Sequence, residues 1–339
     1  MSIRRSVALS TLMGALLVSA CSPSPAPLPS PDASTTPSIA ATASATPSVS
    51  PVPASADFYV APGAVHQSIA QLRAEGRDAD ADLLERAIAS QPQAIWVGDW
   101  LTNEVVEQQG RDVVERAAEQ GAYALFVMYA IPGRDCGLHS AGGLPEQQYL
   151  EFIESFASGI EGSGAWVILE PDALAQLGDC EGQGDRAGLL AGAARILDDA
   201  GVNVYLDAGN SNWLAPEVVV SRLQLVGVEH LEGFSLNVSN YNSTPAESAY
   251  GDVIAAATGL DYVIDTSRNG NGGNGEWCNV RGQALGEPPR VVETGNLDAV
   301  LWIKRPGESD GTCGGAPPAG NWWLEVALEL AANAEANAR

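Results

Sequence analysis

The stretch YALFVMYAI, residues 123–131, is an apolar run that ends at Pro132. Short apolar runs that alternate with amphipathic segments are the signature of βα units and a parallel sheet. Between the runs, residues 146–160 and 185–201 have helical periodicity, and the second segment ends in a glycine suited to a helix C-cap. The other runs are AIWVG (94–98), AWVILEP (165–171), VNVYLDAG (202–209), LEGFSLNVS (231–239), LDYVIDTS (260–267) and DAVLWIK (298–304).

These runs predict the fold class α/β, and a TIM-like parallel β/α barrel fits them better than an open sheet. The chain has no G-x-G-x-x-G after its first run and no G-x-x-x-x-G-K-[ST], so no motif supports a nucleotide-binding fold. In a parallel barrel the functional residues lie at the C-terminal ends of the strands. We therefore expect the active-site cleft at that end of the barrel.

Composition and charge narrow the classes of partner. The 339 residues are 45% hydrophobic, which is enough for a globular core. The net charge of -25, from 42 acidic and 17 basic residues, would repel nucleic acids and anionic membranes. An uncharged substrate is compatible with this acidity but is not identified by it.

The N-terminus predicts export. Residues 1–21 combine Arg4 and Arg5, a short apolar segment and small residues before Cys21, as in a signal peptide. The sequence VSAC (18–21) resembles a bacterial lipobox, so we expect Cys21 to carry a lipid anchor at the cell surface, with a plain secretory peptide as the alternative. Residues 22–56 are rich in Ser, Pro, Ala and Thr and predict an extended linker, followed by one folded domain over 57–339.

The remaining cysteines suit two disulfides outside the cell. A bridge between Cys136 and Cys180 would fasten two loops that carry acids, and one between Cys278 and Cys313 would hold the loop of a third acid. General stabilisation by about 2 to 4 kcal/mol each is the alternative role. No C-x-x-C pair occurs and the three histidines are far apart in the sequence, so we expect no metal site.

The first predicted strand carries a tryptophan, the other six carry or are followed by polar residues, and acids recur at the strand ends. A single Asp in such a place is more often a helix N-cap than a catalyst, but a convergent ring of acids favours a site. The residues are Trp96; Tyr129 and Asp135; Glu170 and Asp172; Asp207; Asn237 and Asn240; Asp265 and Arg268; and Lys304, Glu308 and Asp310.

Facing carboxylates suit the hydrolysis of an acetal, because one acid can protonate the leaving oxygen while another helps to activate water. Tryptophans in or beside the loops can stack on the apolar face of a sugar ring, although each one singly could equally serve packing. These tryptophans are Trp96, Trp100, Trp213, Trp277, Trp322 and Trp323.

Six motifs follow one another along the chain: YAIPGRDCGLHSAGG (129–143), VILEPDALAQL (167–177), VYLDAGNSNWL (204–214), VIDTSRNGNG (263–272), EWCN (276–279) and LWIKRPGESDG (301–311). In this order they resemble glycoside hydrolase family 6, which comprises cellobiohydrolases and endo-β-1,4-glucanases. The resemblance covers essentially all of residues 57–337. It implies a distorted, seven-stranded β/α barrel and hydrolysis of cellulose with inversion of the anomeric centre.

The resemblance also implies roles for the acids. Asp172 is similar to the general acid, and Asp135 to the neighbour that raises its pKa and helps to order the water, with Arg134 in support. Two close carboxylates cannot both ionise cheaply, so one of them keeps its proton near neutral pH. Asp310 resembles the residue proposed as the base, but Lys304 and Arg268 would hold it ionised. The identity of the base therefore stays open.

Further positions resemble the family's substrate-binding residues. Tyr129 is similar to the tyrosine that crowds the sugar at the cleavage point. Asn210 stands where many relatives carry His, and an amide there can still hydrogen-bond a hydroxyl. The other expected contacts are the stacking residues Trp96, Trp213 and Trp277, and the polar residues Asp207, Asn237, Lys304 and Glu308.

The family's two modes of action differ in loop length. Only the short stretch GTCGGAPPAGN (311–321) separates Asp310 from Trp322, which favours an open cleft and cutting of internal bonds. A cellobiohydrolase and a non-catalytic surface carbohydrate-binding protein are the alternatives. We expect a monomer that binds β-1,4-glucan or cello-oligosaccharides, without a cofactor or a nucleic-acid partner.

Overall fold

The computed structural model describes residues 58–292 and 295–339. The predicted signal peptide, Cys21 and the linker 22–56 lie outside the described residues. Within them, one sheet has the strand order β1-β2-β3-β4-β5-β6-β8-β7. The strands are β1 (Ile95–Gly98), β2 (Leu125–Tyr129), β3 (Trp166–Leu169), β4 (Asn203–Asp207), β5 (Gly233–Leu236), β6 (Asp261–Asp265), β7 (Arg290–Val291) and β8 (Leu297–Leu301).

Each of the seven predicted apolar runs overlaps one strand, and these seven strands pair in parallel. The predicted number of seven strands is nevertheless wrong, because β7 adds an eighth, antiparallel to β8. Strand β7 has only two residues, one exposed and one half-buried, so it leaves no apolar run in the sequence.

The sheet is curled into a half-barrel and is not closed by a strand ladder. Among the described residues β1 and β8 do not pair as strands. The segments at their ends are joined by isolated hydrogen bonds instead: the Ala94 N–H donates to the Trp302 carbonyl at 3.0 Å, and Trp96 Nε1 donates to the Ile303 carbonyl at 2.9 Å. The barrel is thus distorted at this seam.

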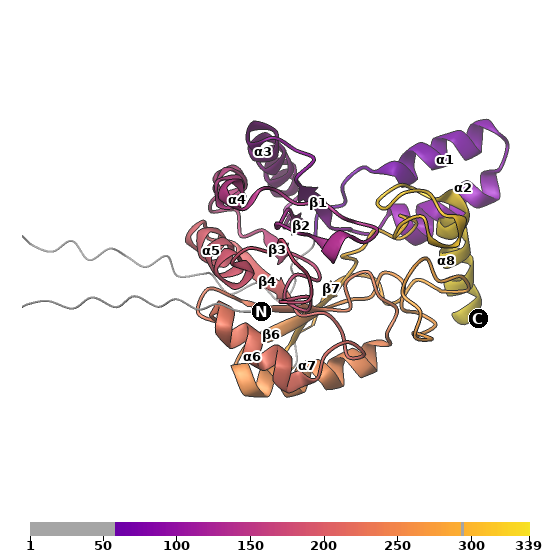
Figure 1. Ribbon diagram of the computed structural model, residues 1–339. Coiled ribbons are helices and arrows are strands. Elements are labelled where there is room, and N and C mark those ends of the chain that lie inside the picture. The colour runs from indigo at the N-terminus through magenta and orange to yellow at the C-terminus, as the bar shows by residue number, and fades with distance from the viewer. Residues whose placement is uncertain (1–57, 293–294) are drawn as a thin grey trace, which may run out of the picture. The chain divides into compact units, whose positions relative to one another are not determined.

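Helices cover the outside of the curled sheet (Figure 1). The helices α3, α4 and α5 lie side by side, and α1, α2 and α8 form a separate group. None of the described helices combines the length and apolar character needed to span a lipid bilayer. The helices are α1 (Ala64–Ala74), α2 (Asp78–Leu84), the π-helical η1 (Glu85–Ala89), α3 (Asn103–Glu119), the 3-10 turn η2 (Asp135–Gly137), α4 (Glu146–Ile160), α5 (Arg186–Asp199), α6 (Pro216–Val226), α7 (Thr244–Thr258), the 3-10 turn η3 (Cys313–Gly315) and α8 (Leu324–Asn337).

Alternation along the strands divides the core into two layers. Leu125, Val127 and Tyr129 of β2 point to the inside of the curl, where Trp166 stacks on Tyr205 with ring centroids 5.0 Å apart. The residues between them, such as those at 126 and 128, pack against the helices. Both faces of β2 to β5 are buried, which explains why these strands are continuous apolar runs in the sequence.

The backbone is strained where several of these strands end. The described non-glycine residues with left-handed φ all lie in loops after β2, β3, β5 or β6, a conformation that is uncommon outside glycine and clusters at functional sites. They are Asp135, Cys136, Glu170, Asp172, Asn237, Ser239 and Asn279.

Candidate active site

A cleft of about 980 Å³ lies over the carboxyl ends of the strands. The sequence predicted this location, and most of the predicted site residues line the cleft. Asp207, Asn237 and Arg268 do not line it; they are buried in the wall behind it. The predicted residues that do line it are Trp96, Trp100, Tyr129, Arg134, Asp135, Asp172, Asn210, Trp213, Asn240, Trp277, Lys304, Glu308 and Asp310.

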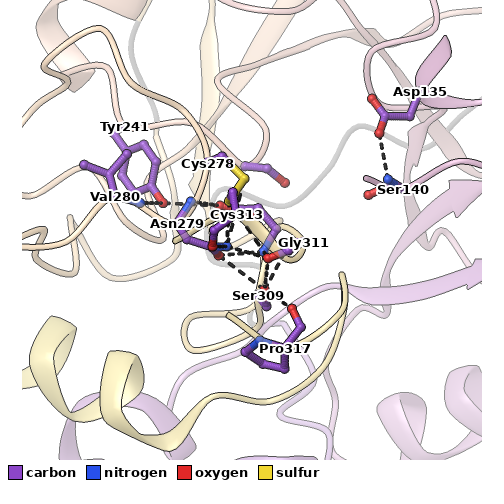
Figure 2. Close-up of a disulfide and its surroundings, with 12 residues drawn as sticks. Asp135, Ser140, Tyr241, Cys278, Asn279, Val280, Ser309, Gly311, Cys313 and Pro317 are labelled. Atoms are coloured by element: carbon purple, nitrogen blue, oxygen red, sulfur yellow. Dashed lines mark hydrogen bonds between the residues drawn. A yellow bond between two sulfur atoms is a disulfide. The ribbon is translucent and has the colours of Figure 1, made fainter. Parts of the chain in front are cut away.

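Asp172 follows β3 in a left-handed conformation with φ 70°. Burial raises the pKa of its carboxyl group to about 7, with further contributions from the negative charges of Asp135 and Asp310. The neighbouring carboxylate Asp135 accepts a hydrogen bond from the Ser140 N–H at 2.7 Å (Figure 2). Near neutral pH the cleft therefore contains a carboxylic acid that can donate a proton.

Asp207 is placed differently from the prediction that it binds sugar. Asp207 is 1% exposed, and its Oδ1 accepts hydrogen bonds from the N–H groups of Asp172 and Gly209, at 2.9 and 3.2 Å. Burial raises its pKa well above the usual range, and the charge of Asp172 adds to this effect. Asp207 supports the backbone of Asp172 from behind the cleft.

Asp310 has the opposite environment. Arg268 Nη1 donates to both of its carboxylate oxygens at 2.9 Å, and Lys304 Nζ lies 3.5 Å from Oδ1. Burial alone would raise the pKa of Asp310, but Arg268 and Lys304 outweigh it and lower the pKa below its ordinary value. Asp310 is thus ionised and weakly basic, as the sequence suggested.

Two disulfides, Cys136–Cys180 and Cys278–Cys313, brace the loops of these acids, and both predicted pairings are confirmed. Figure 2 shows Asn279 beside the second disulfide, where its Nδ2 donates to the Gly311 carbonyl at 2.7 Å. The Asn279 N–H also donates to Asp310 Oδ2 at 2.9 Å. The loop after β6 therefore fixes the position of Asp310, which lies in the loop after β8.

Arg134 fixes the Asp135 loop. Its Nη1 pairs with Asp99 at 2.6 Å and donates to the Tyr129 carbonyl at 2.7 Å, while its Nε donates to the Ser140 carbonyl at 2.8 Å. The guanidinium also lies 4.5 Å from the centroid of the Tyr129 ring. Burial, followed by the charges of Asp172 and Asp135, raises the pKa of Tyr129 well above its ordinary value, so its hydroxyl stays neutral.

Glu170 belongs to the predicted ring of strand-end acids, where it had no specific role, and it is fully buried. Its carboxylate accepts hydrogen bonds from the N–H groups of Ala130 and Ile131 at 3.0 to 3.1 Å. Burial raises its pKa to about 7, against the effect of these hydrogen bonds. Glu170 joins the loop that leads to Asp135 with the segment that leads to Asp172. Its position two residues before Asp172 was the available signal.

The cleft has aromatic surfaces of different exposure. Trp213 and Trp277 are 38% and 48% exposed, and Trp100, another of the tryptophans that the sequence offered for stacking, is 54% exposed. Trp96 is partly buried and packs edge-to-face against Tyr129.

The charged residues of the cleft have partners within the protein. Lys304 Nζ donates to the Ser309 carbonyl, and Glu308 pairs with Arg305 at 3.1 Å. Indoles and charged groups therefore both face the space that a ligand would occupy.

The amides after β4 and β5 form a second polar region. Asn237 is fully buried and, contrary to the prediction that it binds substrate, it holds the backbone of Asn242: its Nδ2 donates to the Asn242 carbonyl and its Oδ1 accepts from the Asn242 N–H, both at 3.1 Å. Asn242 itself lines the cleft next to Asn210 and Asn212. The repeated Asn in NVSNYN (237–242) was the sequence signal for this region.

The donor groups give little support for a metal site. In the described part of the chain, one group of His, Cys, Asp or Glu side chains is close enough to share an ion: His139, Cys278 and Cys313. The two sulfur atoms of this group are bonded to each other, so they are not available as thiolate ligands.

The arrangement is suited to acid-assisted cleavage of a neutral ligand. A protonated carboxyl group, an adjacent carboxylate, an ionised Asp held by two cations and exposed indoles surround one cleft. These are the groups needed to bind a sugar and to protonate its bridging oxygen.

Comparisons with known proteins agree with this chemistry. The family model described as "Glycosyl hydrolases family 6" matches residues 54–334. Endoglucanase A of Cellulomonas fimi is 54% identical over 257 residues, which are 75% of this chain and 57% of that protein. Endoglucanase 1 of Streptomyces sp. (strain KSM-9) is 41% identical over 288 residues, 82% of this chain and 78% of that protein. The chain thus spans less than two thirds of the C. fimi protein.

A solved structure has a similar fold. The endoglucanase Cel6 from Mycobacterium tuberculosis, in complex with methyl-cellobiosyl-4-deoxy-4-thio-β-D-cellobioside, superposes with a TM-score of 0.77 and 41% identity. The match covers 83% of this chain and 98% of that chain.

Proposed function

The chain belongs to family 6 of the glycosyl hydrolases, and from this membership we propose that it hydrolyses internal β-1,4-glucosidic bonds of cellulose or related β-glucans, with inversion. The observation that carries the proposal is the carboxyl group of Asp172, with a pKa of about 7, in a cleft lined by tryptophans. The relatives named endoglucanases support the substrate class.

In the proposed reaction Asp172 gives its proton to the bridging oxygen as the bond from that oxygen to the anomeric carbon breaks. A water molecule forms the new bond to this carbon from the opposite face, which inverts its configuration. The proton that the water loses passes through solvent toward Asp135. Asp310 stays ionised between Arg268 and Lys304 and contributes negative charge near the developing positive charge of the sugar ring.

The sugar chain is held by the exposed indoles and by polar groups of the cleft wall. Trp213 and Trp277 offer stacking surfaces, and Lys304, Glu308 and Asn210 offer hydrogen bonds to hydroxyl groups. Tyr129, which is neutral and packed under Arg134, limits the space at the cleavage point and so favours a distorted ring.

Cutting of internal bonds is supported by the short loop 311–321 and by the names of the relatives. One observation favours the alternative, a cellobiohydrolase. His139 of the Asp135 loop reaches the opposite loops, where its ring lies 5.8 Å from the Trp277 ring and its Cβ packs against Gly311. A contact of this kind covers part of the cleft.

Viscometry with parallel measurement of reducing ends on carboxymethylcellulose tests the proposal. An endoglucanase lowers the viscosity early, whereas a cellobiohydrolase releases cellobiose with little loss of viscosity. Asp172→Ala should lower the rate by at least about 100-fold, because general acid catalysis contributes 10² to 10⁴. Tight binding of cello-oligosaccharides without release of reducing ends would instead indicate a binding protein.

We also propose that the protein is exported and held at the cell surface by a lipid on Cys21, with residues 22–56 as a spacer and the catalytic domain as a monomer. The lipobox-like VSAC and the two disulfides support export. Cys21→Ser should move the protein from the membrane fraction to the soluble fraction. An unchanged distribution would refute the anchor.

A further inference from the structure

The side-chain amide of Asn210 has hydrogen-bond partners at its oxygen but none at its nitrogen among the described residues. The residue is 6% exposed and lines the cleft, as Trp213 does. Its Oδ1 accepts hydrogen bonds from the Asn212 N–H and from Asn242 Nδ2, both at 3.1 Å. Among the described residues no partner accepts from Asn210 Nδ2, and this atom is not one of the fully buried unpartnered atoms. Its two N–H groups are therefore available to a ligand in the cleft.

The orientation of this amide follows from its partners. A backbone N–H can only donate, so the atom of Asn210 that faces the Asn212 N–H must be the oxygen. The nitrogen consequently lies at the other end of the amide, where the cleft is. The cleft wall next to Trp213 presents a donor and not an acceptor at this point.

Asn242 is oriented by the same logic. Its Nδ2 donates to Glu247 Oε1 at 2.9 Å as well as to Asn210, and its Oδ1 accepts from Asn212 Nδ2 at 2.8 Å. Glu247 lies in the first turn of α7, is fully buried and has no ion-pair partner among the described residues. A carboxylate accepts hydrogen bonds, so Glu247 determines which end of the Asn242 amide faces it.

Glu247 itself is held by Ser211. The Ser211 hydroxyl and N–H donate to Oε1 at 2.6 and 3.1 Å, and Oε2 accepts only a weaker bond from the same N–H at 3.2 Å. A glutamine with its carbonyl oxygen in place of Oε1 would keep the main hydrogen bonds. An alkyl side chain would lose all of them.

We propose that Glu247 and Asn242 are positioning residues that keep the N–H groups of Asn210 turned into the cleft, where they donate to a hydroxyl oxygen of a glucosyl unit stacked on Trp213. This inference rests on the proposed function, because it takes a β-1,4-glucan as the ligand. On this inference, the cleft wall formed by Asn210 recognises the sugar through an uncharged hydrogen-bond donor whose orientation is fixed.

The test compares kcat and KM on cellohexaose. Asn210→Ala and Asn242→Ala should each raise KM by about 10-fold, the value of roughly one hydrogen bond, and change kcat less. Asn210→Asp keeps the oxygen that faces Asn212 but turns the free end into an acceptor, so it should raise KM at least as much. A wild-type KM for Asn210→Asp would overturn the assigned orientation.

A double-mutant cycle separates positioning from direct contact. If Asn242 acts through Asn210, the double variant Asn210→Ala/Asn242→Ala should have the KM of Asn210→Ala alone. Additive effects would overturn the positioning role. Glu247→Gln should match the wild type and Glu247→Leu should resemble Asn242→Ala. Asn296→Ala, which removes an exposed amide bound to Asp261, is the matched control.

The outcome for the wild type keeps the two proposals apart. An active wild type with an unchanged KM in Asn242→Ala overturns the inference and leaves the proposed function intact. An inactive wild type overturns the proposed function, and calorimetric titration with cellohexaose then ranks the same variants by affinity. Absence of binding by the wild type would overturn both.

Discussion

Asp172 and Asp310 show how the surroundings separate two residues of one type. Both are largely removed from solvent in the same cleft, yet the pKa of Asp172 is raised to about 7 and that of Asp310 is lowered. The difference comes from the cations, because Arg268 and Lys304 contact Asp310 and no Lys or Arg among the described residues forms an ion pair with Asp172. A proton donor and a fixed negative charge result.

The first prediction concerns the pH profile of kcat/KM on a soluble glucan. Because Asp172 must be protonated, activity should fall as the pH rises through about 7. Part of the pKa shift comes from the charge of Asp135, so Asp135→Asn should move the basic limb of the residual activity to lower pH. A basic limb at the same pH in this variant would contradict the coupling.

The second prediction concerns the buried ion pair. Arg268→Leu leaves Asp310 with Lys304 alone and should lower the free energy of unfolding by about 3 to 5 kcal/mol, as for other buried pairs that lose one partner. Urea unfolding measures this. Arg290→Leu is the matched control, since its pair with Glu287 is exposed and should contribute about 0 to 1 kcal/mol. Equal losses for both variants would contradict the argument.

The sequence predicted most residues of the cleft but not the direction in which each one points. Asp207 ends β4 and Asn237 follows β5, at the same edge of the sheet as Asp172, yet both residues are buried in the wall. The direction depends on local backbone angles, such as the left-handed φ of 66° at Asn237, and on partners distant in the sequence. Spacing alone contains neither kind of information.

At the level of elements, the prediction succeeded where burial is complete. Strands β2 to β5 are buried at every position and were visible as apolar runs. The eighth strand and the open seam between β1 and β8 were not visible, because they depend on two residues of β7 and on isolated hydrogen bonds. The way in which the sheet curls and ends therefore depends on a few local contacts that leave no pattern in the sequence.

The third prediction concerns the loops after β2 and β3. The double variant Cys136→Ser/Cys180→Ser removes the covalent link between them and should lower the stability by about 2 to 4 kcal/mol. It should also lower kcat, because Asp135 adjoins one end of the link. Thermal unfolding and kinetics below the transition measure the two effects.

The second disulfide provides the control for this experiment. The variant Cys278→Ser/Cys313→Ser lacks a link that holds the Asp310 loop but keeps the covalent link between the loops after β2 and β3. A fall of kcat in both variants with the same altered pH profile would show general loosening instead of a local effect on Asp135.

At the scale of the whole molecule, acidity is both a surface property and a property of the interior. The net charge is -25, and several acids are nevertheless buried. Burial raises the pKa of Glu170, Asp172 and Asp298 to about 7, and it also raises the pKa of Asp207 and Asp265. The folded chain therefore holds protons at a pH where the unfolded chain has released them.

The fourth prediction follows from this difference in bound protons. A carboxyl group whose pKa is higher in the folded state stabilises the fold fully below its unfolded value, near 4, and this contribution is lost as the pH rises through about 7. Asp310, with its lowered pKa, acts in the opposite sense, but only below its unfolded value. Between pH 5 and pH 8 the raised groups therefore dominate, and repulsion among the surface acids acts in the same direction.

The midpoint of thermal unfolding should accordingly be lower at pH 8 than at pH 5, by at least about 3 °C, the shift expected for 1 kcal/mol in a domain of this size. Glu170→Gln should flatten the dependence, because it removes one titrating group while keeping an acceptor for the N–H groups of Ala130 and Ile131. Glu154→Gln, on the exposed face of α4, should leave the slope unchanged. A midpoint that is equal or higher at pH 8 would mean that the buried acids are ionised in the folded state, and the proton on Asp172 that the mechanism requires would then be missing as well.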